Sequence, residues 1–516
     1  MTNTSASGPT AFLNVFLVWH PRFQDGERTG LSIGESLFRE FSRDPDAPMS
    51  PAIGIPIYFR TSARTGQAPA PIDLAAAQHN MVVFLTNASM VLDETYRNYV
   101  ETIATASGLN TRILSLVAPG SGKLNVRSLQ EVQLPDDPKE RAALIRLKIV
   151  SECCRFLQNR PRSGDPEGHL SREPAQLFIS HAKRDAANIA EELRLKIQNT
   201  SIDTFFDRVD IAPGYDFSTE LKESIKRSAV IAWQSDEYSS RPWCNIELLT
   251  AKEHLRPIVV VSGLKIGEER SFPYLGNVRT LVADAHDTNE IIIAAAREYL
   301  RKLYSDGLFE LLAAQGSVPK AEFCLFRPPE PVDAALIQRK SADNEETTVL
   351  YPDPPISTIE SGMLKRLFPN IRFITPGTAN QQLLTAVKVA LSISLPESDE
   401  LAAGMSPLHL QAAMIEVARH ILTRGGIIAY GGDLREKNKY GFTRQLFDLV
   451  RVYDDLHRGV LERIWNFLAF PSAAELPEAE ESRLIALAQF KKVLPSDVAS
   501  QFALDIDNPK IGRAHV

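Results

Sequence analysis

The sequence predicts an α/β protein with two flavodoxin-like, five-stranded parallel sheets followed by a Rossmann-like domain. Short β-rich segments alternate with segments of helical period through residues 11–305, as in parallel sheets covered by helices. The strands of one block recur in the next at nearly constant offsets. A glycine-rich strand and turn lie near the chain end. At 516 residues, the chain is too long for a single core.

The clearer block spans residues 174–305. Its predicted strands cover residues 176–180, 202–206, 229–233, 257–261 and 278–282, and its predicted helices cover 186–198, 218–226, 243–254 and 288–302. Five strands joined by helices in this order are typical of a flavodoxin-like sheet, whose ligand site lies beyond the carboxyl ends of the strands.

The preceding block, residues 11–165, repeats this scheme. Its predicted strands cover residues 15–18, 55–59, 80–84 and 113–117. The offset between the blocks is 147 residues from Tyr58 to Phe205 and 148 from Val82 to Val230. We therefore predict two copies of one fold.

The remaining chain divides into three parts. We predict that residues 306–383 form a linker, proline-rich at 328–331 and polar at 339–346, around a small α/β insert. A last domain covers residues 384–510, with a strand at 387–395, a helix at 408–423 and a strand at 426–430.

The two chain ends are expected to lie outside these domains. Residues 1–10 are small and polar, and we expect them to be disordered. Residues 511–516 continue no pattern and resemble a translated sequencing adapter, so we expect a non-native tail after a truncated last domain.

Composition points to a cytoplasmic protein. The net charge of −7 and the pI near 5.9 argue against a nucleic-acid-binding surface. No apolar run approaches the ~20 residues that a membrane helix needs, and no signal pattern opens the chain. The four cysteines, among them the adjacent pair Cys153 and Cys154, show no metal-ligand spacing, which favours free thiols in a reducing compartment and no metal site.

Three motifs in the second block each follow a predicted strand. They are FISHAKRD at residues 178–185, FDRVDIAPGYDF at 206–217 and SDEYSSRPWCNIE at 235–247. Together they resemble the signatures of the TIR (Toll/interleukin receptor) domain: its first strand, its BB loop and the start of its third helix. The resemblance covers about a quarter of the chain.

This resemblance implies cleavage of the nicotinamide–ribose bond of NAD, with Glu247 as the catalytic carboxylate. Nicotinamide leaves as a neutral molecule, so the site must mainly hold the ribose and stabilise oxocarbenium charge. NAD is the substrate, and no further cofactor is expected. We take Trp243, Ser180, His181 and Phe178 as candidate NAD contacts.

Each of these residues also has a purely structural interpretation. Glu247 could be a solvated carboxylate or one that pairs with the helix dipole, although its motif favours catalysis. Trp243 suits core packing as well as ligand stacking. Ser180 and His181 could cap or make local hydrogen bonds. Cys244 is interpreted as a small buried side chain.

The BB-loop motif has a separate predicted role. Asp210, Pro213 and Gly214 are expected to shape a turn and a surface for self-association. In TIR domains this loop packs against a neighbouring copy, so the resemblance implies activity that depends on assembly.

The first block departs from the TIR pattern. At the third helix it reads DETYRNYVE over residues 93–101. Aligning Tyr96 with Trp243 places Val100 opposite Glu247, and Val18 stands where the family has serine. A degenerate copy is favoured over a second active site, and His20 is predicted to be a loop residue.

The last domain contains GGIIAYGGD at residues 425–433 and YGFT at 440–443. Glycines after a strand let backbone N–H groups approach a phosphate, although they also make tight turns. With SISLP at 392–396 the segment resembles a SLOG domain, a Rossmann-like module that binds nucleotide-derived ligands. Candidate contacts are Gly431, Gly432, Asp433 and Thr443, for a cyclic nucleotide or an ADP-ribose-like signal.

Together these features predict an antiviral immune effector. A nucleotide signal at the SLOG-like domain would switch on an NAD glycohydrolase in the TIR domain. Two alternatives remain open: a non-catalytic TIR scaffold that recruits partners, and an enzyme that makes a cyclic ADP-ribose-type messenger.

Overall fold

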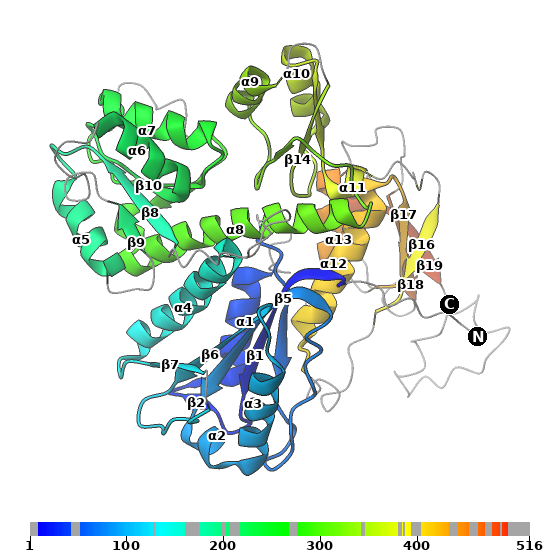
Figure 1. The fold of residues 1–516 in the computed structure, drawn as a ribbon. Helices are drawn as coiled ribbons and strands as arrows, with labels where there is room; N and C mark the ends of the chain where they lie inside the picture. The colour runs from blue at the N-terminus through cyan, green and yellow to red at the C-terminus, as the bar shows by residue number, and fades with distance from the viewer. Residues whose placement is uncertain are drawn as a thin grey trace.

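The computed structural model describes residues 9–42, 52–126, 129–159, 175–198, 203–205, 217–267, 276–341, 346–379, 384, 387–393, 404–432, 442–453, 463–469, 477–485 and 488–493. Within these ranges the strands form four parallel sheets and one short antiparallel ribbon, β2–β3. Helices surround the sheets (Figure 1), and the predicted α/β fold class is confirmed.

The first unit holds a five-stranded sheet of order β4-β1-β5-β6-β7. Its strands are β1 (Ala11–Trp19), β4 (Ile57–Arg60), β5 (Ala77–Thr86), β6 (Thr111–Val117) and β7 (Gln130–Gln133). Its helices are α1 (Gly30–Phe41), α2 (Ala88–Leu92), α3 (Glu94–Ala106) and α4 (Pro138–Gln158), and the ribbon pairs β2 (Gln24–Asp25) with β3 (Arg28–Thr29). Strand β1 and residues 81–85 of β5 are largely apolar because helices cover both faces of the sheet.

The second unit holds a sheet of order β12-β11-β10-β8-β9. Its strands are β8 (Gln176–His181), β9 (Asp203–Phe205), β10 (Ser228–Gln234), β11 (Ile258–Ser262) and β12 (Arg279–Val282). Its helices are α5 (Ala187–Gln198), α6 (Phe217–Arg227) and α7 (Pro242–Glu253). Numbered within each unit, both sheets have the order 2-1-3-4-5, so the predicted repetition of one sheet topology is confirmed.

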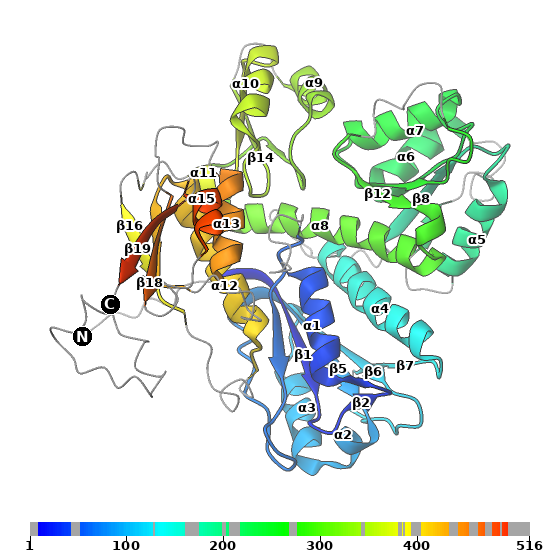
Figure 2. The ribbon, with the colours of Figure 1, turned by 180° about the vertical axis from the view of Figure 1, so that it is seen from behind.

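A single long helix, α8 (Thr288–Ala314), connects the units. It starts at an Asp287 cap and runs across the middle of the molecule, with the second unit at its beginning and the first unit alongside (Figures 1 and 2). The sequence predicted an end at Lys302, which was too early. Residues beyond Lys302, including Tyr304 and Phe309, are buried, and this packing continues the helix through Gly307.

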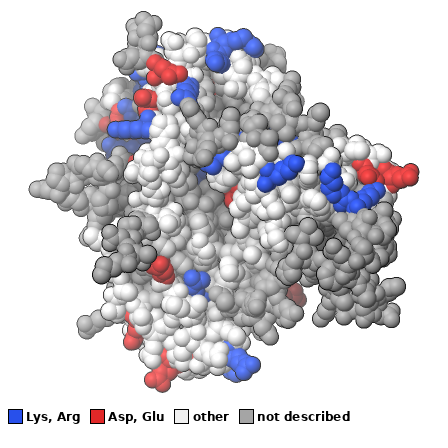
Figure 3. All heavy atoms as spheres, turned by 90° about the vertical axis from the view of Figure 1, so that its right-hand side faces the viewer, with Lys and Arg blue, Asp and Glu red and all other residues white. Residues whose placement is uncertain are grey.

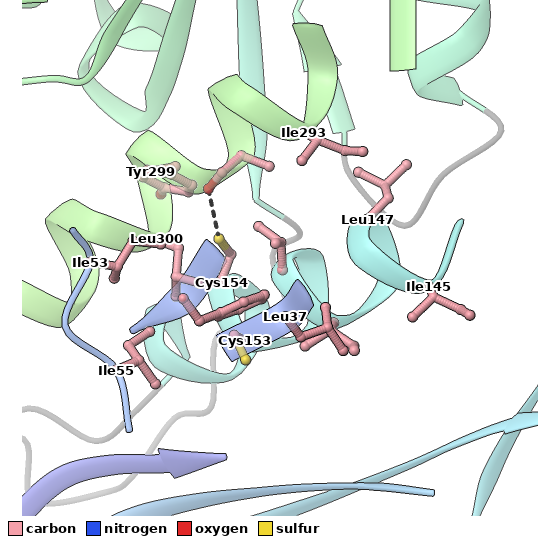
Figure 4. Close-up of a cluster of buried hydrophobic side chains, with 14 of the residues drawn as sticks. Leu37, Ile53, Ile55, Ile145, Leu147, Cys153, Cys154, Ile293, Tyr299 and Leu300 are labelled. Carbon is pink, nitrogen blue, oxygen red and sulfur yellow. Dashed lines mark hydrogen bonds between the residues drawn. The ribbon is translucent and has the colours of Figure 1, made fainter. Parts of the chain in front are cut away.

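The first unit and α8 share one apolar core. In Figure 4, Leu37 of α1, Cys153 and Cys154 of α4, and Leu300 of α8 lie close together. The Cys154 thiol donates to the Ala296 carbonyl oxygen of α8 at 3.5 Å. All four cysteines are free, and burial raises the pKa of the Cys153 and Cys154 thiols, so both act as packing residues.

A third, smaller unit follows α8. Its sheet has the order β13-β14-β15, with β13 (Phe323–Cys324), β14 (Thr347–Leu350), β15 (Ile371–Ile374), α9 (Pro331–Lys340), α10 (Thr358–Leu367) and α11 (Pro376–Ala379). The predicted linker at 328–331 and 339–346 is wrong in part, because α9 starts at Pro331 and ends at Lys340. A proline at the first helical position is compatible with a helix, and Ala334 and Ile337 of α9 are buried.

The fourth unit contains a parallel sheet of order β16-β17-β18-β19. Its elements are β16 (Lys388–Leu391), α12 (Pro407–Thr423), β17 (Ile427–Tyr430), α13 (Phe442–Tyr453), β18 (Ile464–Ala469), α15 (Glu478–Leu484) and β19 (Ala488–Val493). Figure 3 views the molecule from the side of this unit, and the coloured basic side chains stand singly or in small groups with acidic ones among them. Among the described helices, none is long and apolar enough to cross a membrane.

The start of α12 and the chain just before it cover the open edge of the first sheet. The Phe59 N–H of edge strand β4 donates to the Gly404 carbonyl oxygen at 3.2 Å, and His409 Nε2 donates to the Ile57 carbonyl oxygen at 2.8 Å. Gly404 has a φ of +102°, and a Cβ there would lie 2.3 Å from the Phe59 oxygen, so glycine is needed. Covering an edge strand in this way protects it from unwanted pairing.

This contact is expected to loosen in acid. The Ser406 N–H donates to His409 Nδ1 at 3.0 Å, which requires a neutral ring. Burial lowers the pKa of His409 below its ordinary value of 6.5, and Arg60 acts in the same direction. As pH falls, His409 is protonated at a higher pH in the unfolded chain than in the folded protein. The contact therefore stabilises the fold fully above pH 6.5, and this contribution is lost as pH falls below 6.5. Hydrogen exchange at β4 and the start of α12, corrected for intrinsic rates, should therefore accelerate between pH 7.5 and 5.5.

The matched variant is His409→Gln, which keeps a donor and an acceptor but does not titrate. Its corrected exchange should not change over the same range. An equal acceleration in this variant would show that another group carries the pH dependence.

Candidate functional site

The candidate site lies at the carboxyl edge of the second sheet. Ser180 is the last residue but one of β8, and α7 begins shortly after β10 ends. Strands β8 and β10 are parallel neighbours, with Ser180 paired to Ala232. Because parallel strands end at the same edge, this brings the first and third motifs of the sequence together.

Three buried side chains form a hydrogen-bonded chain at this edge. The Ser180 hydroxyl donates to Glu247 Oε2 at 2.5 Å, and Ser180 Oγ lies 2.7 Å from the Tyr238 hydroxyl. Since the single Ser180 proton is directed at the carboxylate, Tyr238 is the donor to Ser180. Burial is the main cause that raises the pKa of Tyr238 far above its ordinary value, so this donor stays protonated.

The position of Glu247 argues against a helix-dipole role. Glu247 is the sixth residue of α7, beyond the first turn, which contains no acidic residue, and the dipole effect fades within that turn. It is only 6% exposed, which also excludes a solvated surface carboxylate. Glu247 is instead a buried carboxylate at the sheet edge that accepts a directed hydrogen bond from Ser180.

Tyr238 was not among the residues predicted for the site. It is fully buried and reaches Ser180 from the loop between β10 and α7. Its place in the Ser-x-x-Tyr part of the third motif was the available signal. A tyrosine is often a core residue, so only the contact with Ser180 reveals its role.

Two further residues of α7 differ in exposure. Cys244 is 3% exposed, and burial, with Glu247 adding to it, raises the pKa of its thiol to about 12. This agrees with the prediction of a small buried side chain and argues against a nucleophile. Trp243 is 46% exposed, so core packing is excluded and the ring lies at the surface one turn from Glu247.

The structure corrects the roles predicted for Phe178 and His181. Phe178 is 1% exposed and packs in an apolar cluster with Leu221 and Leu248, so its ring supports the site from below and is closed off from solvent. His181 follows Ser180 in β8, and side chains alternate between the faces of a strand. It therefore lies on the opposite face from Glu247, paired with Trp233.

Carboxylates link the loops around this edge. Asp185 accepts from the Ser235 hydroxyl at 2.8 Å, and Asp236 accepts from the backbone N–H groups of residues 265–267. These bonds hold the loops after β8, β10 and β11 together. The predicted BB-loop residues Asp210, Pro213 and Gly214 lie outside the described residues.

Comparison with known families agrees with this geometry. The family model described as "TIR domain" matches residues 177–289, and the model described as "SLOG cluster2" matches residues 383–512. The chain contains a TIR domain and a SLOG domain. No curated protein matches the sequence.

Among solved structures, the TIR domains of the activated Roq1 resistosome directly recognizing the pathogen effector XopQ show similarity. The identity is 17%, and the match covers 27% of this chain and 99% of that one with a TM-score of 0.17. The assignment of the TIR domain therefore rests on the family model and on the motifs.

In the first unit, the helix alignment predicted from sequence is wrong by one residue. Counted from the first residue of each helix, Tyr99 of α3, not Val100, occupies the position of Glu247 in α7. The buried residues agree with this, since Tyr96 and Val100 then match Cys244 and Leu248. The Tyr99 hydroxyl donates to the Ala70 carbonyl oxygen, so no carboxylate lies at this position.

The end of β1 in the first unit also differs from the end of β8 in the TIR domain. Val18 stands at the strand position of Ser180, as predicted. His20 follows β1 as a loop residue but is 1% exposed, and its Nε2 lies 3.4 Å from Asp93 Oδ2. That this unit is a degenerate TIR copy stays a prediction.

The glycines of the SLOG domain follow β17. Gly432 is in close contact with its neighbours, since a Cβ there would lie 2.1 Å from Tyr430 Cε1 and 2.2 Å from Thr443 Oγ1. The Gly432 N–H donates to Asn466 Oδ1 at 3.4 Å. Asn466 of β18 is fully buried and was missed from sequence, where nothing distinguishes it from other strand residues. Asp433 lies outside the described residues.

We expect the two glycines to respond differently to substitution. Gly432→Ala should disrupt this turn, because overpacking typically costs about 1–3 kcal/mol. Gly431→Ala should be tolerated sterically, since the nearest atom to a Cβ there is 3.8 Å away. Thermal unfolding of both variants tests this, and equal melting temperatures would contradict the packing role of Gly432.

Proposed function

We propose that the TIR domain cleaves NAD at the nicotinamide–ribose bond, with Glu247 as its catalytic carboxylate. Water attacks the ribose C1′ as the C1′–N bond breaks, the bonding pair leaves with nicotinamide, and the water proton is released. The products are nicotinamide, ADP-ribose and a proton. The site must supply negative charge to the oxocarbenium-like transition state, while NAD itself brings the leaving group.

The observation that carries this proposal is the chain from Tyr238 through Ser180 to Glu247. Glu247 is only 6% exposed, and it lies at the sheet edge where ligands bind in this topology. The Ser180 bond orients the carboxylate before substrate arrives, and such preorganisation is the usual source of electrostatic catalysis. The exposed ring of Trp243 offers an aromatic surface for the dinucleotide.

We propose further that a nucleotide-derived signal at the SLOG domain controls this activity in immune defence. The contacts that support this run from α12 to α7. Gly377 of α11 packs beside Thr423 of α12 and donates to Asp353 of the third unit at 3.0 Å. At the other end of that unit, Glu330, next to α9, forms a buried ion pair with Lys252 of α7.

Self-association through the TIR domain is part of the same proposal. Assembly would bring the loop that contains Asp210, Pro213 and Gly214 against a neighbouring copy. Activity would then depend on assembly, because the neighbouring copy helps to complete the site.

The deciding experiment incubates the purified full chain with NAD and follows nicotinamide release. It is run with and without cyclic nucleotides and ADP-ribose, and beside Glu247→Ala. Release by the wild type and none by the variant is expected. Equal release by both proteins, or no release under any of these conditions, would contradict catalysis by Glu247 and favour a non-catalytic TIR scaffold. Chromatography of the products separates ADP-ribose from a cyclic messenger.

A further inference from the structure

Three large apolar side chains of α10, in the third unit, face solvent. Ile359 is 70% exposed, Met363 39% and Leu367 57%. They are spaced four residues apart, so they form a stripe along one face of the helix. Leu364 packs instead in the core of the third unit and is 2% exposed. Single exposed apolar residues are common on protein surfaces, but a continuous apolar stripe marks an interaction surface.

The place of α10 in the molecule separates this stripe from the candidate NAD site. The third unit lies between the TIR and SLOG domains in the chain and belongs to neither. In both views of the ribbon, α9 lies between α10 and the TIR domain (Figures 1 and 2). The stripe is therefore a surface of the third unit itself.

The residues around Met363 are arranged symmetrically along the helix. Ile359 and Leu367 stand four positions before and after Met363. Glu360 and Arg366 stand three positions before and after it. When two such helices pack antiparallel about a twofold axis at Met363, each residue meets its opposite number on the other helix. Glu360 then comes level with Arg366 of the second copy, whereas a parallel pair would bring like charges together.

The two charged side chains are available for such a contact. Both are exposed, and Arg366 forms no ion pair with any residue that the structure describes. Glu360 Oε2 accepts from the Ser357 hydroxyl at 3.0 Å and from the Ser357 N–H at 3.3 Å. Its other oxygen, Oε1, has no partner within the described ranges. Complementary charges beside an apolar seam fix the orientation of the two partners.

We propose that α10 is a pairing surface for a second copy of this chain, with the two helices antiparallel and Met363 at the centre. The helix has ten residues, about 15 Å of length. A pair of this size buries less than the roughly 1,200–2,000 Å² of a standard interface, so the contact alone is weak and depends on concentration. It brings two TIR domains into one particle, and it does not depend on whether they cleave NAD.

Sedimentation equilibrium of the full chain at rising concentration tests the pairing. The wild type should approach twice its mass of 57.2 kDa. In Met363→Lys the dissociation constant should rise about tenfold or more, because the lysine puts an ammonium group without a partner into the apolar seam.

The matched control is Leu109→Lys, which adds the same charge at a leucine of the first unit that is 82% exposed. It should associate like the wild type. A wild type that stays monomeric at every concentration would overturn the proposal, and so would equal association of the wild type and Met363→Lys. An equal loss in Leu109→Lys would trace the effect to net charge and would also remove the role of α10.

Cysteine cross-linking tests the orientation without weakening the surface charge pattern. Met363→Cys should form a disulfide with its own copy under mild oxidation, because the twofold axis passes between the two residues. Ile359→Cys and Leu367→Cys should link when the two variants are mixed. Neither should link to itself, since two copies of either residue are about 12 Å apart along an antiparallel pair and a disulfide joins Cα atoms within about 7 Å.

The wild type, in which Cys153, Cys154 and Cys244 are buried, gives the background of this experiment. Self-linking of Ile359→Cys as fast as that of Met363→Cys would indicate a parallel pair and contradict the proposed geometry. Cross-linking of all three variants at the background level would show that α10 is not a contact between copies.

Discussion

Replacing Glu247 by glutamine is expected to slow nicotinamide release from NAD by about a hundredfold or more, the scale seen when one preorganised electrostatic contact is removed from an active site. Glutamine has nearly the same shape and still accepts the Ser180 hydroxyl hydrogen. What it lacks is the negative charge that the oxocarbenium-like transition state requires. The measurement is the initial rate at saturating NAD, so that a change in binding does not mimic a change in chemistry.

The matched control for this prediction is Glu223→Gln on α6 of the same domain. Glu223 pairs with Lys226 at the surface, and its loss should leave the rate unchanged. Full activity in Glu247→Gln would remove Glu247 from the mechanism. An equal loss in both variants would trace the effect to the domain's stability or net charge.

Replacing Lys252 by alanine is expected to cost about 3–5 kcal/mol, the usual penalty for breaking a buried ion pair from one side. Lys252 has no exposed surface and contacts Glu330 and the Gly276 carbonyl oxygen. Arg327 donates to Glu330 at 3.1 Å and to Asp333 at 2.9 Å. Without the lysine, this network holds two carboxylates against one guanidinium inside the protein.

The network joins the TIR domain to the third unit. Breaking it should therefore destabilise mainly the two helices on either side of it. Hydrogen exchange of α7 and α9 should accelerate in Lys252→Ala. Arg339 and Lys340 of α9 also contact Glu253 at the end of α7. The end of α7 and α9 should therefore exchange faster together. The control is Lys226→Ala, which removes an exposed ion pair with Glu223, and exposed pairs contribute little to stability.

A double variant separates the charge from the packing. In Lys252→Met/Glu330→Gln both partners become neutral, and much of the loss should be recovered, since uncharged side chains of similar size avoid the cost of an unpaired buried charge. If hydrogen exchange of α7 and α9 is equal in Lys252→Ala and in the Lys226→Ala control, the ion pair between Lys252 and Glu330 does not stabilise these helices.

Several local features were accessible from sequence because each depends on residues close together in the chain. Parallel strands buried on both faces appear as continuous apolar runs, so the central strands such as β1 and β10 were predicted within a few residues. From sequence, the prolines at 328–331 indicate a linker and the predicted helix at 288–302 ends too early. Tertiary packing overrode both, since buried contacts stabilise a helix more than propensity does.

The one-residue error between α3 and α7 has a similar cause. The sequence aligns the aromatic residues Tyr96 and Trp243, but Tyr96 is buried while Trp243 is 46% exposed. The side chains that match are those that pack under the helix. Which residues are buried depends on the whole sheet and the elements packed against it. A motif of nine residues therefore does not predict which of its side chains are buried.

For the candidate site, strand order and one motif were enough to predict the fold class, the sheet edge and Glu247 as the residue to test. Three other features came from the packing of distant segments: Tyr238 joins Ser180 and Glu247, Phe178 lies beneath the site, and Lys252 is buried against Glu330. The pair Lys252 and Glu330 is separated by 78 residues. A contact of this kind depends on how distant segments pack, and periodicity reports only the few neighbours of each residue.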